Sequence, residues 1–259
     1  MILGFIGTGH MGSSIARALH QQGIHRFLLN NRTKTKAIAI KEEFGADAEV
    51  ATLEEIAAQA DIIFVGVKPT DMDDVLRALP AHHGIIVSMA AGVSLQELVE
   101  VLPNSRIIRI LPNTPVVVGA GITLTTFDGS FTPKEKDAFF SLMSPTGRMI
   151  EVGEDKLNPG GVITGSAPAY LDYFIDALAE AGVNMGLSKV EATEYVLHMC
   201  RGAIELALSS TKSPRQLGDE VCSPGGSTIE GVKVLLERDL YGLVRDAAIA
   251  TYQKNKKMR

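Results

Sequence analysis

The sequence predicts an α/β domain over residues 1–153, followed by an all-helical domain over residues 154–259. Three observations support this prediction. Short apolar runs alternate with helical segments in the first half, as in a parallel sheet covered on both faces. Gly7, Gly9 and Gly12 spell G-x-G-x-x-G directly after the first predicted strand. From Asp155 onward apolar residues recur at intervals of three and four, which is typical of helices. The first part therefore predicts a Rossmann-like dinucleotide-binding domain.

The elements of the first domain follow one another in a regular order. Apolar runs that end in glycine or polar residues predict strands, and amphipathic stretches that end in glycine predict helices. The expected strands are residues 2–7, 26–30, 61–67, 84–90 and 106–111. The expected helices are residues 11–23, residues 33–45, a stretch after Pro69, and residues 94–102.

The second half predicts long helices over residues 170–186, 190–210 and 240–255. These helices are apolar on more than one face; Tyr170 and Phe174, for example, share a side with many alanines nearby. A helical domain of this kind buries surface against a second copy of itself. We therefore expect an all-helical dimerisation domain and a homodimer, and leave a larger homo-oligomer open.

Composition and net charge disfavour several kinds of binding partner. Of the 259 residues, 46 % are hydrophobic and 21 % charged, as in an ordinary globular protein. The net charge of −5 argues against a nucleic-acid partner, and no apolar stretch is long enough to span a bilayer. Cys200 and Cys222 have neither metal-binding spacing nor a disulfide framework, which fits a reducing compartment. We expect a cytoplasmic protein with a small-molecule substrate and no metal, nucleic acid or membrane partner.

The first glycine turn has the strand before it and the helix after it that a dinucleotide site requires. Glycines at these positions permit a tight turn, close approach of a pyrophosphate, and close packing of helix on strand. The helix N-terminus then faces the phosphates. His10 is expected near the cofactor without a role in proton transfer. The cofactor-binding residues expected here are Ile6, Gly7, Gly9, His10, Met11 and Gly12.

The end of the second predicted strand selects the cofactor. NAD sites place an acidic residue there to hold the ribose 2′-hydroxyl, whereas this chain reads FLLNNRTKTK over residues 27–36. A 2′-phosphate can accept hydrogen bonds from Asn31, Arg32 and Thr33. Arg32 can donate two hydrogen bonds to it at the same time. We therefore expect NADP(H) to be preferred, with NAD(H) left open.

Two further strands end in segments that face the ligand edge of such a sheet. The first, residues 66–71, contains Val67, Lys68 and Pro69, and Lys68 is either solvated or a charge partner of the ligand. The second, residues 88–94, contains Ala90 and Ala91, whose small side chains let a nicotinamide ring approach the backbone. We include these residues among the expected cofactor contacts.

A second glycine turn lies near the C-terminus, where residues 222–231 read CSPGGSTIEG. The backbone N–H groups of Gly225, Gly226, Ser227 and Thr228 can converge on an anion, aided by the positive end of the following helix. Serine and glycine are also normal at a helix start, so the residues alone leave simple helix capping open.

Six segments together resemble the pyrroline-5-carboxylate reductase family over nearly the whole chain. The resemblance lies in residues 4–12, 67–69, 88–94, 109–121 and 164–188, and above all in SPGGSTIEGVKVLLE at residues 223–237. It implies NADPH-dependent reduction of Δ1-pyrroline-5-carboxylate to L-proline, the last step of proline biosynthesis, by an intertwined dimer. It also implies that the second glycine turn binds the substrate carboxylate and that the Thr228 hydroxyl bonds the substrate near its nitrogen. The substrate-binding residues so implied are Ser223, Gly225, Gly226, Ser227 and Thr228, with Thr228 as the catalytic residue.

Three positions depart from the pattern of that family. Ala167 stands where a second glycine is usual, Thr52 where many members carry asparagine, and Ser227 where threonine or alanine is common. A β-hydroxyacid dehydrogenase is disfavoured, because the stretch that would carry its catalytic lysine has none after Gly161. The alternative left open is a relative that binds the cofactor without turnover and acts as a regulatory or interaction protein.

Overall fold

The computed structural model describes residues 1–23, 25–90 and 92–257. The chain forms two compact units, one made of Met1–Ser166 with Thr251–Arg259 and the other of Ala167–Ala250. The boundary between residues 153 and 154 that the sequence suggests stays a prediction.

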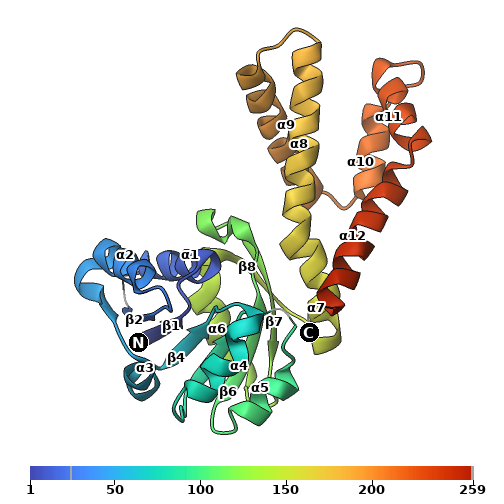
Figure 1. Ribbon diagram of the computed structural model, residues 1–259. Helices are drawn as coiled ribbons and strands as arrows, with labels where there is room; N and C mark the ends of the chain where they lie inside the picture. Colours follow the sequence, from blue (N-terminus) through green and yellow to red (C-terminus); the bar gives the residue numbers. More distant parts are fainter. Residues whose placement is uncertain (24, 91, 258–259) are drawn as a thin grey trace. The chain divides into compact units, whose positions relative to one another are not determined.

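One sheet of eight strands lies at the centre of the first unit (Figure 1). Its order is β3-β2-β1-β4-β5-β6-β7-β8, and all neighbouring pairs are parallel except β6 and β7. The strand order reverses between β1 and β4, which is where open α/β sheets bind ligands. The strands are β1 (Ile2–Ile6), β2 (Arg26–Asn30), β3 (Ala48–Val50), β4 (Ile62–Val65), β5 (Ile85–Ser88), β6 (Arg106–Leu111), β7 (Gly121–Phe127) and β8 (Gly147–Glu151).

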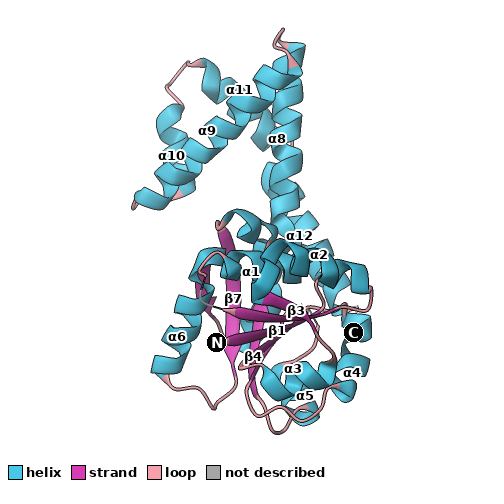
Figure 2. Ribbon diagram, turned by 90° about the vertical axis from the view of Figure 1, so that its left-hand side faces the viewer, coloured by secondary structure: helices cyan, strands magenta, loops and turns pink. Residues whose placement is uncertain are grey.

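Helices cover both faces of this sheet (Figure 2). Side chains of α1, α2 and α6 pack with one apolar cluster, and side chains of α3, α4 and α5 pack with the other. The central strands β1, β2, β4, β5 and β6 are mostly buried and carry near-continuous apolar runs, as expected for strands covered on both faces. These helices are α1 (His10–His20), α2 (Lys34–Phe44), α3 (Leu53–Gln59), α4 (Pro69–Ala78), α5 (Leu95–Val101) and α6 (Pro133–Met143).

The five strands and four helices expected in this unit are confirmed as β1, β2, β4, β5, β6, α1, α2, α4 and α5. Three strands, β3, β7 and β8, were not expected from the sequence. Thr52, which departs from the family pattern, caps α3: its side chain accepts from the Glu55 backbone N at 3.2 Å, and Glu55 accepts from the Thr52 N at 2.8 Å.

The second unit consists of helices. The three long helices expected are confirmed as α8, α9 and α12, although the end of α12 from Thr251 on belongs to the first unit. α8 and α9 pack through Ala179, Ala192 and Val196, and Gly182 allows close approach to Ala192. Many large apolar side chains remain exposed, such as Tyr173 and Leu208, each 80 % exposed. None of the described helices is long and apolar enough to cross a membrane. The helices after the sheet are α7 (Glu154–Gly161), the π-helical η4 (Val162–Ser166), α8 (Ala167–Asn184), α9 (Lys189–Ser209), α10 (Pro214–Val221), α11 (Ser227–Glu237) and α12 (Leu240–Lys256).

An ion pair fastens the start of β6 to the start of α6. Arg106 donates to Glu135 at 2.7 Å, and the Glu135 carboxylate also accepts from the hydroxyl and the backbone N of Thr132. Chiefly through the hydrogen bond from Arg106, these contacts lower the pKa of Glu135 to about 2. A carboxyl whose pKa is lowered on folding stabilises the folded state above its ordinary pKa and loses that effect as pH falls towards the lowered value.

Replacing Glu135 by glutamine should therefore remove an acid-dependent part of the stability. We expect the difference in free energy of unfolding between wild type and Glu135→Gln to be constant near neutral pH and to shrink as pH falls from about 4.5 to about 2. Urea unfolding across this range measures the difference. In an Arg106→Gln background the same substitution should give a much flatter difference; an equally steep one would mean that Arg106 does not set this pKa.

Candidate functional site

The first glycine loop joins β1 to α1 and has three glycines with distinct environments. Gly7 has φ +93°, and a Cβ there would lie 2.7 Å from the carbonyl carbon of Gly66, at the end of β4. A Cβ at Gly12 would lie 2.2 Å from the Gly7 carbonyl oxygen. At Gly9 a Cβ would meet nothing within 4 Å. Packing of the chain therefore requires glycine at 7 and 12, whereas the open space beside Gly9 fits the approach of a dinucleotide phosphate.

Helix α1 begins at His10 without a side-chain cap, because its N-cap residue is Gly9. The first N–H groups of a helix have no partner within the helix, so those of His10, Met11 and Gly12 are available to an anion. The Ser13 and Ser14 hydroxyls instead bond back to the His10 carbonyl, at 3.0 and 2.7 Å. The Ile6 side chain is buried in the core, so Ile6 offers only backbone to the loop.

The loop after β2 lies beside the first glycine loop. The Asn31 side chain accepts from the Thr8 backbone N at 3.0 Å and donates to the Thr33 carbonyl at 3.0 Å. Arg32 is 79 % exposed on its side chain and contacts the Asp71 carboxylate, in the first turn of α4, at 3.1 Å. The structure thus brings together the ends of β1, β2 and β4, as expected for a dinucleotide site.

The segments after β4 and β5 complete this edge of the sheet. Lys68 is exposed and serves as the N-cap residue of α4, which begins at Pro69, while Val67 is partly buried. The Ala90 side chain is buried in the sheet core, so Ala90 can present only its backbone to a ligand. Ala91, also expected here, lies outside the described residues.

The second glycine turn lies in the helical unit and precedes α11. Gly225 has φ +74°, and the Gly226 backbone N donates to the Ser223 carbonyl at 2.9 Å. Helix α11 begins at Ser227 with Gly226 as its N-cap and no side-chain cap. The neighbouring helices α9 and α10 are both capped by serine side chains. The N–H groups at the start of α11 are therefore available to an anion, and the Ser223, Ser227 and Thr228 side chains are exposed.

Comparison with known proteins identifies relatives along the whole chain. The model of the pyrroline-5-carboxylate reductase dimerisation family matches residues 154–258, and that of the coenzyme F420-dependent NADP oxidoreductase family matches residues 2–92. Pyrroline-5-carboxylate reductase of Escherichia coli (strain K12) is 34 % identical over 263 residues, covering 99 % of this chain and 97 % of that protein. The chain belongs to the pyrroline-5-carboxylate reductase family.

Solved structures of pyrroline-5-carboxylate reductases have the same fold. The enzyme from Streptococcus pyogenes is 30 % identical, with a TM-score of 0.91 and coverage of 99 % of this chain and 98 % of its own. Plasmodium falciparum pyrroline carboxylate reductase, solved with NADP bound, is 28 % identical, with a TM-score of 0.89 and coverage of 100 % and 98 %. The predicted family and fold class are therefore confirmed.

Two residues of this chain near the ligand edge of the sheet, Arg109 and Asn113, were not predicted from the sequence as functional residues. Arg109, on β6, is buried and bonded to Glu154, the first residue of α7. A charged residue inside the otherwise apolar end of RIIRIL was the one signal that could have indicated it. Asn113, also buried, links the Ile122 backbone N at 2.8 Å to the Thr164 carbonyl at 3.0 Å.

Proposed function

We propose that this chain is an NADPH-dependent pyrroline-5-carboxylate reductase that catalyses the last step of proline biosynthesis in the cytoplasm. When bound, NADPH supplies the hydride that reduces the C=N bond of Δ1-pyrroline-5-carboxylate to L-proline. The observation that carries this proposal is sequence similarity to pyrroline-5-carboxylate reductases over 99 % of the chain. The free thiols of Cys200 and Cys222 are consistent with a reducing compartment.

Different residues of the first unit bind the pyrophosphate, the ribose 2′-phosphate and the rest of the cofactor. The N–H groups at the start of α1 bind the pyrophosphate, and the open space at Gly9 admits it. Arg32, held near Asn31 and Thr33, donates to the ribose 2′-phosphate. The remaining contacts come from the segments after β4 and β5 and comprise Val67, Lys68, Pro69, Ala90 and Ala91.

The residues of the second glycine turn hold the substrate. The N–H groups of Gly225, Gly226, Ser227 and Thr228 bind the carboxylate, and Ser223 shapes the turn through its carbonyl bond to the Gly226 N. The Thr228 hydroxyl forms a hydrogen bond with the substrate near its ring nitrogen and thereby orients it. A neutral hydroxyl is a weak acid, so the proton of the product amine comes from water or from the already protonated imine. Orientation is then the larger contribution of the protein.

The proposal is tested by following NADPH absorbance in the presence of pyrroline-5-carboxylate, with NADH in a parallel reaction. We expect substrate-dependent oxidation that is faster with NADPH. Folded protein that binds NADPH but oxidises neither cofactor would contradict the proposal and would instead identify a non-catalytic relative.

Replacing Arg32 by serine should reduce the preference for NADPH. We expect the ratio of kcat/KM with NADPH to kcat/KM with NADH to fall by about tenfold or more, because a hydrogen bond to a charged group contributes roughly 1.5–3 kcal/mol. The value with NADH should change little. Steady-state kinetics with both cofactors measures the ratio.

Arg17→Ser is the matched control for this change. Arg17 also lies in the first unit and contacts a carboxylate, that of Glu43, at 2.8 Å. Its loss should leave the cofactor ratio unchanged. Asp71→Asn removes the carboxylate that competes for Arg32 and should increase NADPH affinity. An unchanged ratio in Arg32→Ser would remove Arg32 from cofactor selection.

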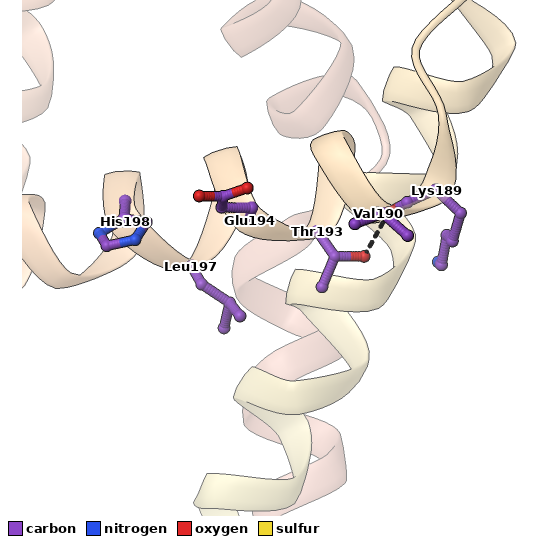
Figure 3. Close-up of a pocket in the computed structure, with 6 residues that line it drawn as sticks. All are labelled: Lys189, Val190, Thr193, Glu194, Leu197 and His198. Carbon is purple, nitrogen blue, oxygen red and sulfur yellow. Dashed lines mark hydrogen bonds between the residues drawn. The ribbon is translucent and has the colours of Figure 1, made fainter.

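The helical unit forms a homodimer, and a larger homo-oligomer is compatible with its exposed apolar surface. A groove on α9 is lined by six residues on successive turns (Figure 3). Within it Val190 is 77 % exposed and Leu197 is 50 % exposed. Exposed apolar surface of this kind is typical of protein–protein contacts. The six residues are Lys189, Val190, Thr193, Glu194, Leu197 and His198.

A further inference from the structure

Arg109 is a charged side chain buried in the sheet, 2 % exposed. It lies on β6 beside Ser88, the last residue of β5. Arginine keeps its charge in proteins, and burial of that charge is unfavourable unless it is paired and hydrogen-bonded. Its partner Glu154 is 37 % exposed on its side chain, so the buried charge is that of the arginine. Apolar side chains in place of buried charges are often neutral or stabilising. Stability alone therefore does not explain an arginine here.

Arg109 contacts the connection between β5 and α5 directly and also through Glu154. One guanidinium nitrogen, Nη1, donates to Oε1 of Glu154, and the other, Nη2, lies 3.5 Å from the Ala90 carbonyl oxygen. The same Oε1 atom of Glu154 accepts from the Leu95 backbone N at 2.9 Å. Ala90 lies near the start of the β5–α5 connection and Leu95 directly follows it, so the ion pair contacts the chain near both ends of the connection.

This connection lies next to the first glycine loop. The Met89 backbone N donates to the Val65 carbonyl at 3.0 Å, and a Cβ at Gly66 would lie 2.7 Å from the Met89 methyl carbon. Gly66 in turn contacts Gly7 so closely that a Cβ at Gly7 would clash with it. A displacement of the connection would therefore also shift the backbone at the edge of the sheet where the cofactor is proposed to bind.

We propose that Arg109 and Glu154 are positioning residues that hold the β5–α5 connection in the place required for hydride transfer. The inference rests on the proposed function, since this connection carries the contacts assigned to the nicotinamide half of NADPH. Arg109 and Glu154 touch neither reacting atom; they act through the Ala90 carbonyl and the Leu95 N–H. Small displacements of a donor relative to its acceptor have large effects on rate.

The first test uses kinetics of Arg109→Lys. Lysine keeps the charge but lacks the planar fork that reaches Glu154 and the Ala90 carbonyl together. We expect kcat to fall by about tenfold or more while the Kd for NADPH, measured by its fluorescence, changes by less than about threefold. A kcat within about twofold of wild type, from folded protein, would overturn the inference.

Arg106→Lys is the matched control. Arg106 lies on the same strand, also pairs with a glutamate, and is three residues away, at the first position of β6. We expect its kcat to equal that of wild type. An equal fall of kcat in both variants would show a general effect of strand β6 and would overturn the specific role of Arg109.

The second test needs no cofactor and no activity. In Glu154→Ala the Leu95 N–H loses its acceptor, so its hydrogen exchange in the cofactor-free protein should become about tenfold faster or more. The matched variant Glu135→Ala should leave Leu95 exchange unchanged. Unchanged exchange in Glu154→Ala would overturn the anchoring role, also in the event that Arg109→Lys fails to fold.

The two tests separate this inference from the proposed function. If wild-type protein fails to reduce pyrroline-5-carboxylate, the proposed function fails, whereas the exchange result for Leu95 still decides whether Glu154 anchors the connection. If wild type turns over and either positioning variant behaves like wild type, the inference alone fails.

Discussion

Replacing Thr228 by alanine should lower kcat/KM for pyrroline-5-carboxylate by about 10²-fold or more, the low end of effects seen for positioned acid–base groups. Thr228 lies in the first turn of α11, directly after the uncapped glycine turn, and its side chain is exposed. Its hydroxyl is the group assigned to the substrate near the ring nitrogen. Steady-state kinetics at saturating NADPH measures the loss.

Two variants distinguish the hydroxyl from the shape of the side chain. Thr228→Ser keeps the hydroxyl and should retain most of the activity, whereas Thr228→Val keeps the shape and should lose as much as alanine. Since Thr228 is exposed, thermal unfolding should be nearly unchanged in all three. A Thr228→Ala enzyme within threefold of wild type would remove this residue from the mechanism.

Replacing Gly12 by alanine should damage both the fold and cofactor binding. The new Cβ would lie 2.2 Å from the Gly7 carbonyl oxygen, a backbone atom that cannot move aside without shifting the loop. Forced overpacking of this kind costs about 1–3 kcal/mol. We expect a loss of unfolding free energy of that size, measured by urea denaturation, together with a Kd for NADPH raised by about tenfold or more.

Gly9→Ala separates the effect on stability from the effect on NADPH binding. A Cβ there meets nothing within 4 Å, and Gly9 has an extended backbone with φ −69° that alanine adopts freely. The unfolding free energy should therefore change by less than about 1 kcal/mol. NADPH binding should still weaken by about tenfold, because the added methyl group occupies the space assigned to the pyrophosphate. Unweakened binding in Gly9→Ala would show that the pyrophosphate does not approach Gly9.

Strands with long apolar runs were predicted correctly from the sequence. The runs IIFV in β4 and RIIRIL in β6 are apolar enough to require burial on both faces of a sheet. The strands that were missed lack such runs. β7 contains three threonines among its seven residues and is nevertheless buried, β8 reads GRMIE, and β3 has only three residues.

The residues of the candidate site also differ in whether the sequence predicts them. Glycine turns have spacings that can be recognised, so Gly7, Gly9 and Gly12 were predictable from the sequence. Arg109 and Glu154 lie 45 positions apart, and their pairing depends on how α7 packs against β6 and β7. There Gly161 and Gly160 bring α7 close to Leu111 and Leu124. Such a contact follows from the tertiary structure and has no local pattern.

The proposed reaction converts pyrroline-5-carboxylate to proline and consumes one NADPH for each proline formed. The most direct measurement is the amount of L-proline formed, determined by chiral chromatography, against the amount of NADPH consumed in the same reaction. We expect equal amounts of the two, no proline in reactions without cofactor, and about 10²-fold less proline with Thr228→Val at matched times. NADPH consumption without proline, or no consumption by folded protein that binds NADPH, would contradict the assignment.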